Sequence, residues 1–337
     1  MNKFSVIICL SGLLLCLPAC QPAGSPKKAL ITGEAQGTSY RVIYYAADTP
    51  VTKPVIDSLL DAFNLIASVW EENSVISRIN NNDSTVEAGA EFINIFKQAQ
   101  RISEATNGAF DITVGPLVNA WGFGFRNRIE MDAHVVDSLL PLVGYRKVRL
   151  EGNKIVKDNP AIQIDYNAIA KGYSVDWLGG FLSANGIKNY LVEIGGEIVT
   201  RGSKPGGVPW VVGIEKPAPA ADAPQVLEAT ITLINRALAT SGNYRKFYEK
   251  GGVRYSHTID PATGYPVQHS LLSATVIADS AAIADGYATA FMVMGLEKAR
   301  AFLTQHPELE AYFIYSGSDG NFQTWATERL RKIIHEQ

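Results

Sequence analysis

Apolar positions in the first half of the chain recur at helical spacing. Between 55 and 70 they fall three or four residues apart, and a second series of this kind runs from 92 to 106. Gly108 follows the second series and is typical of a residue that ends a helix. A shorter series covers 132–143. The pattern therefore predicts three helices, at 55–70, 92–106 and 132–143.

Short runs rich in β-branched and aromatic residues predict strands, and these dominate the remainder of the chain. The expected strands lie at 40–45, 148–150, 154–156, 162–164, 190–194, 211–214, 227–234, 275–278, 312–315 and 322–325. Two further helices are expected at 168–184 and 280–305, the second being the longest. Strands and helices do not alternate regularly, so we expect an α+β fold with a two-lobed body rather than a doubly wound sheet.

The first twenty residues have the pattern of an export signal. An apolar run at 4–17 follows Lys3 and is shorter than the roughly 20 residues that span a bilayer. It ends in Leu-Pro-Ala-Cys20, which resembles the bacterial lipobox, in which the cysteine is lipidated and becomes the first residue. A plain signal peptide with an incidental cysteine is the alternative. We expect a signal peptide at 1–19, a lipid-anchored tether at 20–30, and an exported protein held at the periplasmic face of a membrane in the cell envelope.

Composition narrows the chemistry of the body. The chain has 337 residues, 47% of them hydrophobic, and a formal net charge of −3, so a broad basic surface for nucleic acid is excluded. All three cysteines lie within the first twenty positions, at Cys9, Cys16 and Cys20. The rest of the chain therefore has no disulfide, cysteine nucleophile or Cys-ligated metal site.

Two polar, glycine-containing stretches in the middle of the chain carry candidate binding residues. Asp111 lies among small residues at the expected start of a strand, although on its own it is more typical of a turn aspartate that caps the end of the preceding helix. Asp165 ends an expected strand, and Lys171 follows in the first turns of a helix. A lysine at a helix N-terminus favours anion binding. The alternative is a solvated lysine behind a structural N-cap aspartate.

Two later stretches carry candidate catalytic and metal-binding residues. His257 precedes an Asp-Pro-x-Thr-Gly turn and suits a general acid or base, although a structural histidine beside a turn is a serious alternative. Asp285 and Thr289 lie four residues apart on a largely apolar helix, so they share one face. Their oxygens suit Mg²⁺. In the alternative, Asp285 is exposed and Thr289 bonds to its own helix, but a charge on an apolar helix favours an ion or partner.

Taken together, these stretches resemble the FAD:protein FMN transferase family, the ApbE-like flavin transferases. The motifs that carry the resemblance lie at 37–40, 74–80, 111–117, 121–122, 168–176, 193–197, 256–264 and 284–289. Single pieces such as a Gly-Gly pair are weak, whereas all of them in this order are highly specific.

The resemblance implies a T-fold-like, two-lobed body with largely antiparallel sheets and FAD in the cleft between the lobes, so that 31–337 is the catalytic domain. It implies a Mg²⁺-dependent enzyme that attaches FMN from FAD to a threonine hydroxyl of a target flavoprotein through a phosphoester bond and releases AMP. Some relatives instead hydrolyse FAD to FMN and AMP. A lipid-anchored flavin-binding protein without catalysis is the non-enzyme alternative.

The resemblance also assigns residues to roles. Those expected to bind FAD are Gln36, Trp70, Ala109, Phe110, Asp111, Asp165, Lys171 and Ile259. The Ala168 carbonyl, Asp285 and Thr289 are expected to hold Mg²⁺. Our candidate for the base that deprotonates the acceptor is His257, with Asp260 or Asp285 as alternatives. Gln36 stands where many members have methionine, and Ala288 where some have a second acidic residue, so the metal would have one carboxylate fewer.

Overall fold

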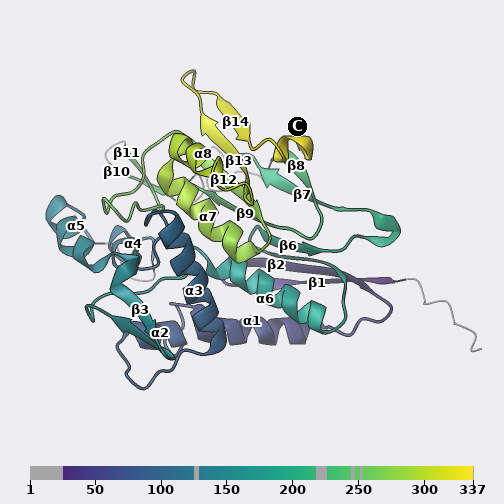
Figure 1. Ribbon diagram of the computed structural model, residues 1–337, viewed down its shortest axis with the longest axis horizontal. Helices are drawn as coiled ribbons and strands as arrows, with labels where there is room; N and C mark the ends of the chain where they lie inside the picture. The colour runs from purple at the N-terminus through teal and green to yellow at the C-terminus, as the bar shows by residue number, and fades with distance from the viewer. Residues whose placement is uncertain (1–25, 125–128, 218–225, 244–246, 251–252, 337) are drawn as a thin grey trace, which may run out of the picture.

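A large antiparallel sheet forms the centre of the protein in this computed structural model, which describes residues 26–124, 129–217, 226–243, 247–250 and 253–336. Figure 1 shows the sheet with the main helices packed on it. In spatial order its eight strands are β1 (Lys27–Ala35), β2 (Thr38–Ala46), β5 (Asn189–Ile194), β6 (Glu197–Arg201), β9 (Ala237–Gly242), β12 (Leu271–Ala278), β13 (Glu310–Ser316) and β14 (Phe322–Ala326).

Smaller sheets surround it. Three strands form a second sheet in the order β15 (Ile334–Glu336), β8 (Leu227–Leu233) and β7 (Trp210–Glu215). Two separate hairpins are β3 (Val148–Glu151) with β4 (Lys154–Lys157), and β10 (Phe247–Lys250) with β11 (Val253–Ser256). The mostly antiparallel pairing confirms the α+β fold class.

The described helices gather mainly on one face of the large sheet. They are α1 (Lys53–Ala67), α2 (Val75–Asn80), α3 (Ala90–Ala105), α4 (Gly115–Trp121), α5 (Ala133–Leu139), α6 (Ala170–Ala184), α7 (Ala281–Met294) and α8 (Leu296–Leu303), with 3₁₀ turns at Leu140–Leu142, Tyr145–Lys147, Pro205–Gly207 and Leu330–Lys332.

Alternation along the strands explains this layering. Successive side chains of a strand point to opposite faces. In β13, Phe313 packs into the core beneath the helices, whereas Ile314 packs against the three-stranded sheet. In β5, Val192 and Leu191 divide between the two faces in the same way. The large sheet is therefore buried on both faces.

Two tight hairpins bring polar residues to one end of this sheet. The β1–β2 turn is Gln36-Gly37, with φ of 54° and 73°, and the β5–β6 turn is Gly195-Gly196, with φ of 61° and 105°. Positive φ at both central residues is the geometry that two-residue hairpins favour. The Gly195 amide donates to the Ser39 carbonyl at 3.1 Å, so the two tips lie side by side.

Helices α6 and α7 approach each other closely, as Figure 1 shows. A Cβ on Gly172 would lie 2.3 Å from the carbonyl oxygen of Ala281, so only glycine fits there. Asp176 of α6 also caps α7: its carboxylate accepts hydrogen bonds from the Ser280 hydroxyl at 2.7 Å and from the amides of Ala281 and Ala282 at 2.9 Å. These contacts fix the start of α7 against the first half of α6.

Replacing Gly172 by Ala is expected to destabilise the protein by about 1–3 kcal/mol, because the new methyl group forces α6 away from α7. Gly180→Ala is the matched control on the same helix, since a Cβ there meets nothing within 4 Å. It should stabilise the protein by about 0.5–1 kcal/mol. Urea unfolding of both variants measures the difference, and equal stability would contradict the close packing.

Several sequence predictions of local structure differ from the structure. The helix expected at 280–305 is two helices, because Gly295 adopts a φ of 74° between α7 and α8. The helix expected at 132–143 stops at Leu139 and continues as the 3₁₀ turn that contains Pro141. Strand β1 was not expected, and it begins at Lys27, inside the segment assigned to the tether.

The segment 162–164, expected to be a strand, is irregular because side chains satisfy its backbone. Asn80 accepts from the Ile164 amide at 2.7 Å and donates to the Ile164 carbonyl at 2.8 Å. The Lys157 ammonium donates to the Ile162 carbonyl at 2.9 Å. A strand partner is therefore not needed, although the apolar side chains of this segment are buried as a strand pattern predicts.

Candidate functional site

Asp285 and Thr289 lie one turn apart on α7, as expected. Asp285 is only 4% exposed, so the alternative in which it faces solvent is wrong. Its Oδ2 accepts the Gly172 amide at 3.1 Å, and burial raises the pKa of its carboxyl. The Thr289 hydroxyl lies 3.2 Å from the hydroxyl of Ser241, which comes from β9. The pair therefore joins α6, α7 and the large sheet.

Lys171 occupies the first turn of α6, as the sequence predicted, and forms an ion pair that it did not predict. Its Nζ lies 2.5 Å from Oε1 of Glu197, the first residue of β6. Glu197 is 2% exposed, and burial raises its pKa to about 7. Burial alone would lower the pKa of Lys171, but the negative charges of Glu197 and Asp285 raise it. The charge of Lys171 on α6 therefore interacts with those of Glu197 on β6 and Asp285 on α7.

The motif at 193–197 contains Glu197, but no role for this residue followed from the sequence. The available signal was its position directly after two glycines and before the apolar pair Ile198-Val199. A carboxylate at such a position requires a partner once the strand is buried. The partner could not be read from the sequence because Lys171 lies 26 positions earlier.

The chain offers oxygen atoms that fit a divalent cation beside this cluster. Gly172 is the third residue of α6, so its amide has no partner within the helix, and it donates to Asp285 rather than to the Ala168 carbonyl four residues earlier. In the part of the chain that the structure describes, no other donor reaches the Ala168 carbonyl. That carbonyl, the second oxygen of Asp285 and the Thr289 hydroxyl are hard donors of the kind Mg²⁺ takes.

This donor set contains a single acidic side chain. Elsewhere too, the described residues hold no group of three or more His, Cys, Asp or Glu side chains placed to bind a metal. Mg²⁺ commonly takes one or two protein carboxylates and completes its shell with substrate phosphates and water. The residues present therefore fit Mg²⁺ together with a phosphate ligand.

Gln36 reaches this region from the β1–β2 turn. Its Oε1 lies 3.3 Å from the Ser174 hydroxyl, which donates to the Lys171 carbonyl at 2.8 Å. Its Nε2 is buried without a partner among the described residues. The turn thus directs an amide donor towards the start of α6, where a ligand could accept from it.

Asp165 lies just before α6 on the segment that Asn80 holds. Its amide donates to the Ile112 carbonyl at 2.7 Å, and its carboxylate accepts from the amide of Asn167 at 2.7 Å. Burial raises the pKa of Asp165. A Cβ on Gly115 would lie 3.5 Å from the Asp165 Cβ, so the first residue of α4 lies directly beside it.

Asn80→Ala is expected to cost about 2–4 kcal/mol of stability, because it leaves both backbone polar groups of buried Ile164 without their partner. Asn81→Ala is the control, as that side chain is exposed and should change stability by no more than about 0.5 kcal/mol. Chemical denaturation measures both. A loss as small as that of the control would show that Asn80 does not fix the segment.

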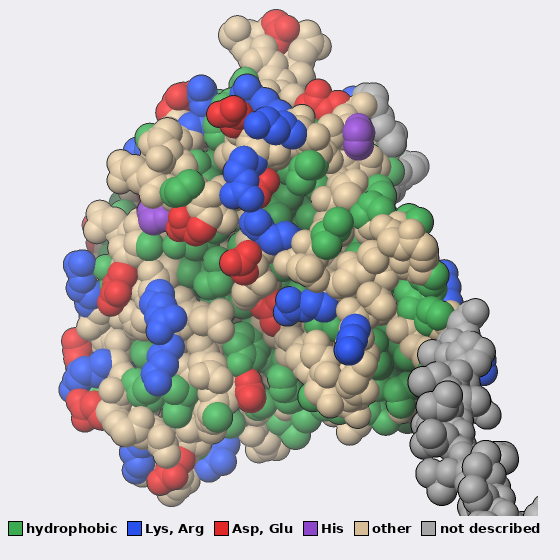
Figure 2. All heavy atoms as spheres, turned by 45° about the vertical axis from the view of Figure 1, so that its right-hand side comes forward, with side chains coloured by type: hydrophobic (Ala, Val, Ile, Leu, Met, Phe, Trp, Pro, Cys, Tyr) green, Lys and Arg blue, Asp and Glu red, His purple; other side chains and the backbone are tan. Residues whose placement is uncertain are grey.

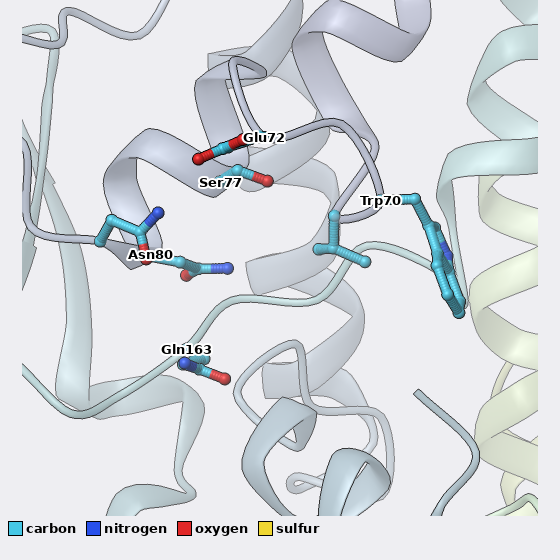
Figure 3. A pocket seen from close by; sticks show the side chains of 7 residues that line it. Trp70, Glu72, Ser77, Asn80 and Gln163 are labelled. Carbon is cyan, nitrogen blue, oxygen red and sulfur yellow. The ribbon is translucent and has the colours of Figure 1, made fainter. Parts of the chain in front are cut away.

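Trp70 lies on the loop between α1 and α2, with 64% of its surface exposed. It borders a pocket of about 210 Å³, which Figure 3 shows with Trp70 at one end and Asn80 and Gln163 at the other. Gln163 is two residues from Asp165. The pocket therefore places an exposed aromatic ring near the segment that carries Asp165.

The 109–111 run lies in the loop before α4, not in a strand. Phe110 is buried in the main core. The Asp111 carboxylate accepts from the Thr113 amide at 2.8 Å, from the Thr113 hydroxyl at 2.6 Å and from the Tyr145 amide at 2.7 Å. Burial raises its pKa. Both side chains face the protein, so Asp111 braces this loop.

His257 and Ile259 lie on the segment after β11, where Ile259 packs against α4 and His257 against Phe123, just after that helix. Ile259 belongs to a small separate core with Leu117 and Trp121. The His257 ring lies 6.4 Å from the ring of Phe123, edge to face. Trp121 Nε1 donates to the Gly264 carbonyl at 2.9 Å, and this hydrogen bond fixes the segment to α4. These contacts all lie within the segment 256–264 and the residues of α4 and just after it, and none of them joins His257 or Ile259 to the cluster at Lys171.

The surface of the molecule adds two observations. Figure 2 shows acidic and basic side chains interspersed over one face, in keeping with the near-neutral net charge. Among the residues that the structure describes, no helix is long and apolar enough to cross a bilayer. The expected lipidation site, Cys20, lies outside the described residues.

Comparison with known proteins assigns the chain to a family. The model of the ApbE family matches residues 36–313. Two proteins named FAD:protein FMN transferase, from Vibrio cholerae and Haemophilus influenzae, are 36% and 35% identical to this chain. The alignments cover 97% of this chain and 98% of the first protein, and 99% of this chain and 99% of the second.

Solved structures agree. The flavin transferase ApbE from Vibrio cholerae superimposes with a TM-score of 0.80 at 36% identity, over 91% of this chain and 99% of that one. The apo form of the Pseudomonas stutzeri flavinyl transferase ApbE gives a TM-score of 0.80 at 32% identity, over 92% of this chain and 97% of that one. This chain therefore belongs to the ApbE family.

Proposed function

We propose that this transferase uses Mg²⁺ to move FMN from FAD to a threonine hydroxyl of an acceptor flavoprotein subunit, releasing AMP. Transfer of FMN from FAD to a protein is the activity named for its relatives. The observation that carries the proposal for this chain is the cluster of half-buried Lys171 and buried Asp285 beside the Ala168 carbonyl. It combines a cation, a carboxylate and a carbonyl oxygen at one helix start.

Lys171 and the start of α6 bind the phosphate part of FAD in this proposal. A helix N-terminus presents unpaired amides and a positive dipole end, and the adjacent ammonium adds a full charge. Donors aimed at oxygens that gain charge in the transition state contribute most to a transfer of this kind. Glu197 holds the ammonium in place.

The Ala168 carbonyl, Asp285 and Thr289 hold the cation. When bound, Mg²⁺ neutralises the diphosphate and polarises the phosphorus that is attacked. The Gly172 amide fixes one oxygen of Asp285, so the orientation of this carboxylate is set before any ligand binds.

The remaining residues position the reactants. Trp70, Gln36 and Asp165 hold FAD, as the resemblance implies. The threonine hydroxyl attacks the FMN phosphorus: the new O–P bond forms, the bond to the AMP phosphate breaks, and AMP leaves with its electrons. His257 accepts the hydroxyl proton.

Release of AMP, measured with and without an acceptor polypeptide and with Mg²⁺ or EDTA, tests this function. We expect AMP only when both Mg²⁺ and acceptor are present, in equal amount to the flavin attached. AMP without an acceptor would instead support an FAD pyrophosphatase. Tight FAD binding with no AMP under any condition would support a binding protein.

We also propose that the chain is exported and anchored through lipidated Cys20 at the periplasmic face of a membrane. The support is the apolar run at 4–17 followed by Leu-Pro-Ala-Cys20. Acyl chains contribute about 0.8 kcal/mol per buried methylene, so several chains hold a protein at a surface. Metabolic labelling with a fatty acid should mark the wild type and not Cys20→Ser, and label on both would overturn the assignment.

A further inference from the structure

We propose that Glu197 is a positioning residue that holds Lys171 away from Asp285, which leaves an oxygen of Asp285 available to a cation. The proposal deepens the function above and rests on its assignment of Asp285 to the metal. It concerns a contact between residues of this chain that the sequence motifs did not assign.

The cluster contains two acids and one base on three elements. Lys171 comes from α6, Glu197 from β6 and Asp285 from α7. The ammonium bonds to Glu197 Oε1 at 2.5 Å, and within the described residues no ion pair joins it to Asp285. The charges of Lys171 and Asp285 nevertheless interact. The Asp285 carboxylate also accepts the amide of Gly172, the residue that follows Lys171, so it lies beside the turn of α6 that carries the lysine.

The two oxygens of Asp285 have different surroundings. Oδ2 accepts the Gly172 amide, whereas no described residue donates to Oδ1. A lysine has a flexible four-carbon stem and a compact charge, so it can turn to a new partner. If Lys171 turned to Asp285, it would neutralise the carboxylate and compete with a cation for Oδ1.

Glu197 is well placed to prevent this. Backbone pairing with Ile194 across the Gly195-Gly196 turn fixes its position at the start of β6. Its Oε2 is buried with no partner among the described residues, so Lys171 is the group that compensates its charge. A buried carboxylate with one counter-ion holds that ion strongly, because leaving it unpaired is costly.

Binding of Mn²⁺ to the FAD-free full chain, followed by electron paramagnetic resonance of the free ion, tests the proposal without any turnover. Glu197→Gln keeps the size of the side chain and removes its charge, and should weaken Mn²⁺ binding about tenfold, the usual effect of losing a partner that orients a metal site. Glu193→Gln, on the other strand of the same hairpin, is the matched control and should bind like wild type.

The double variant Lys171→Met/Glu197→Gln separates this role from direct ligation. Without the ammonium nothing occupies Asp285, so Mn²⁺ affinity should return to within about threefold of Lys171→Met. If Glu197 were itself a ligand, the double variant would bind as weakly as Glu197→Gln, and the proposal would be overturned. Unchanged binding in Glu197→Gln would also overturn it.

Lys171→Met alone keeps the test decisive should Glu197→Gln fail to fold. Removing the competitor should leave Mn²⁺ affinity equal to or tighter than that of wild type, and weaker binding would contradict the proposal. Asp285→Asn tests the metal site itself, on which this inference rests. It should abolish Mn²⁺ binding, and wild-type binding in that variant would overturn the metal assignment and this inference with it.

Discussion

Asp285→Asn is expected to lower the rate of FMN transfer by about 10³-fold while leaving the fold intact. The variant loses the only carboxylate expected to bind Mg²⁺, which supplies several kcal/mol of charge stabilisation in phosphate chemistry. The asparagine oxygen can still accept the Gly172 amide, so the contact between α6 and α7 is retained. The initial rate of flavin attachment at saturating FAD and Mg²⁺ measures the effect.

Asp279→Asn is the matched control for this variant. Its side chain is 93% exposed just before α7, where it pairs with Arg236. Its transfer rate should equal that of wild type. A rate for Asp285→Asn within a fewfold of this control, with both proteins folded by circular dichroism, would exclude Asp285 from the metal site.

His257→Ala is expected to slow FMN transfer by about 10²–10⁴-fold, the range typical of a lost general base, and to change FAD affinity little. Ile259, two residues further along, stays packed in the small core with Leu117 and Trp121, so the segment keeps its position. Stopped-flow or quenched-flow transfer rates and the Kd for FAD should be measured together.

His134→Ala controls for the loss of an imidazole, since His134 is exposed on α5. It should affect neither rate nor FAD affinity. A collapse of FAD affinity in His257→Ala with little change in the rate at saturating FAD would assign His257 to binding and reject it as the base.

Local sequence patterns were sufficient to predict helices and strands whose hydrogen bonds are made within the element or to the next strand along the chain. The helical spacing at 92–106 corresponds closely to α3, and the strands expected at 312–315 and 322–325 pair as β13 and β14. Asp285 and Thr289 were placed on one helix face because a spacing of four residues determines that. The apolar composition of that helix also indicated correctly that the carboxylate is buried.

The sequence did not predict the local structure correctly where side chains from distant positions make the hydrogen bonds of the backbone. The segment 162–164 has the apolar pattern of a strand, but its backbone bonds to Asn80 and Lys157, which no local pattern reveals. Gly295 divides the expected long helix, although a single glycine is tolerated in many helices. β1 follows a Pro/Gly/Ser-containing stretch and was assigned in part to the tether.

The residues of the candidate site also divide into those that local sequence patterns place correctly and those whose partners are distant in sequence. Gln36, Lys171 and Asp285 lie around the start of α6, and their binding of a phosphate stays a prediction. Glu197 was missed because its partner depends on how a hairpin tip packs on a helix. Asp111 was expected to bind FAD; its carboxylate accepts from Thr113 and Tyr145, and a contact between this side chain and FAD stays a prediction. Whether its loop contacts FAD through the backbone stays a prediction.

Mass spectrometry of an acceptor polypeptide tests the central claim most directly. The full chain is incubated with FAD, Mg²⁺ and a polypeptide that contains one threonine, alongside a copy with alanine at that position. We expect one FMN group on the threonine of the first polypeptide and none on the second. An unmodified threonine while FAD is consumed and AMP accumulates would contradict transfer and show that water is the acceptor.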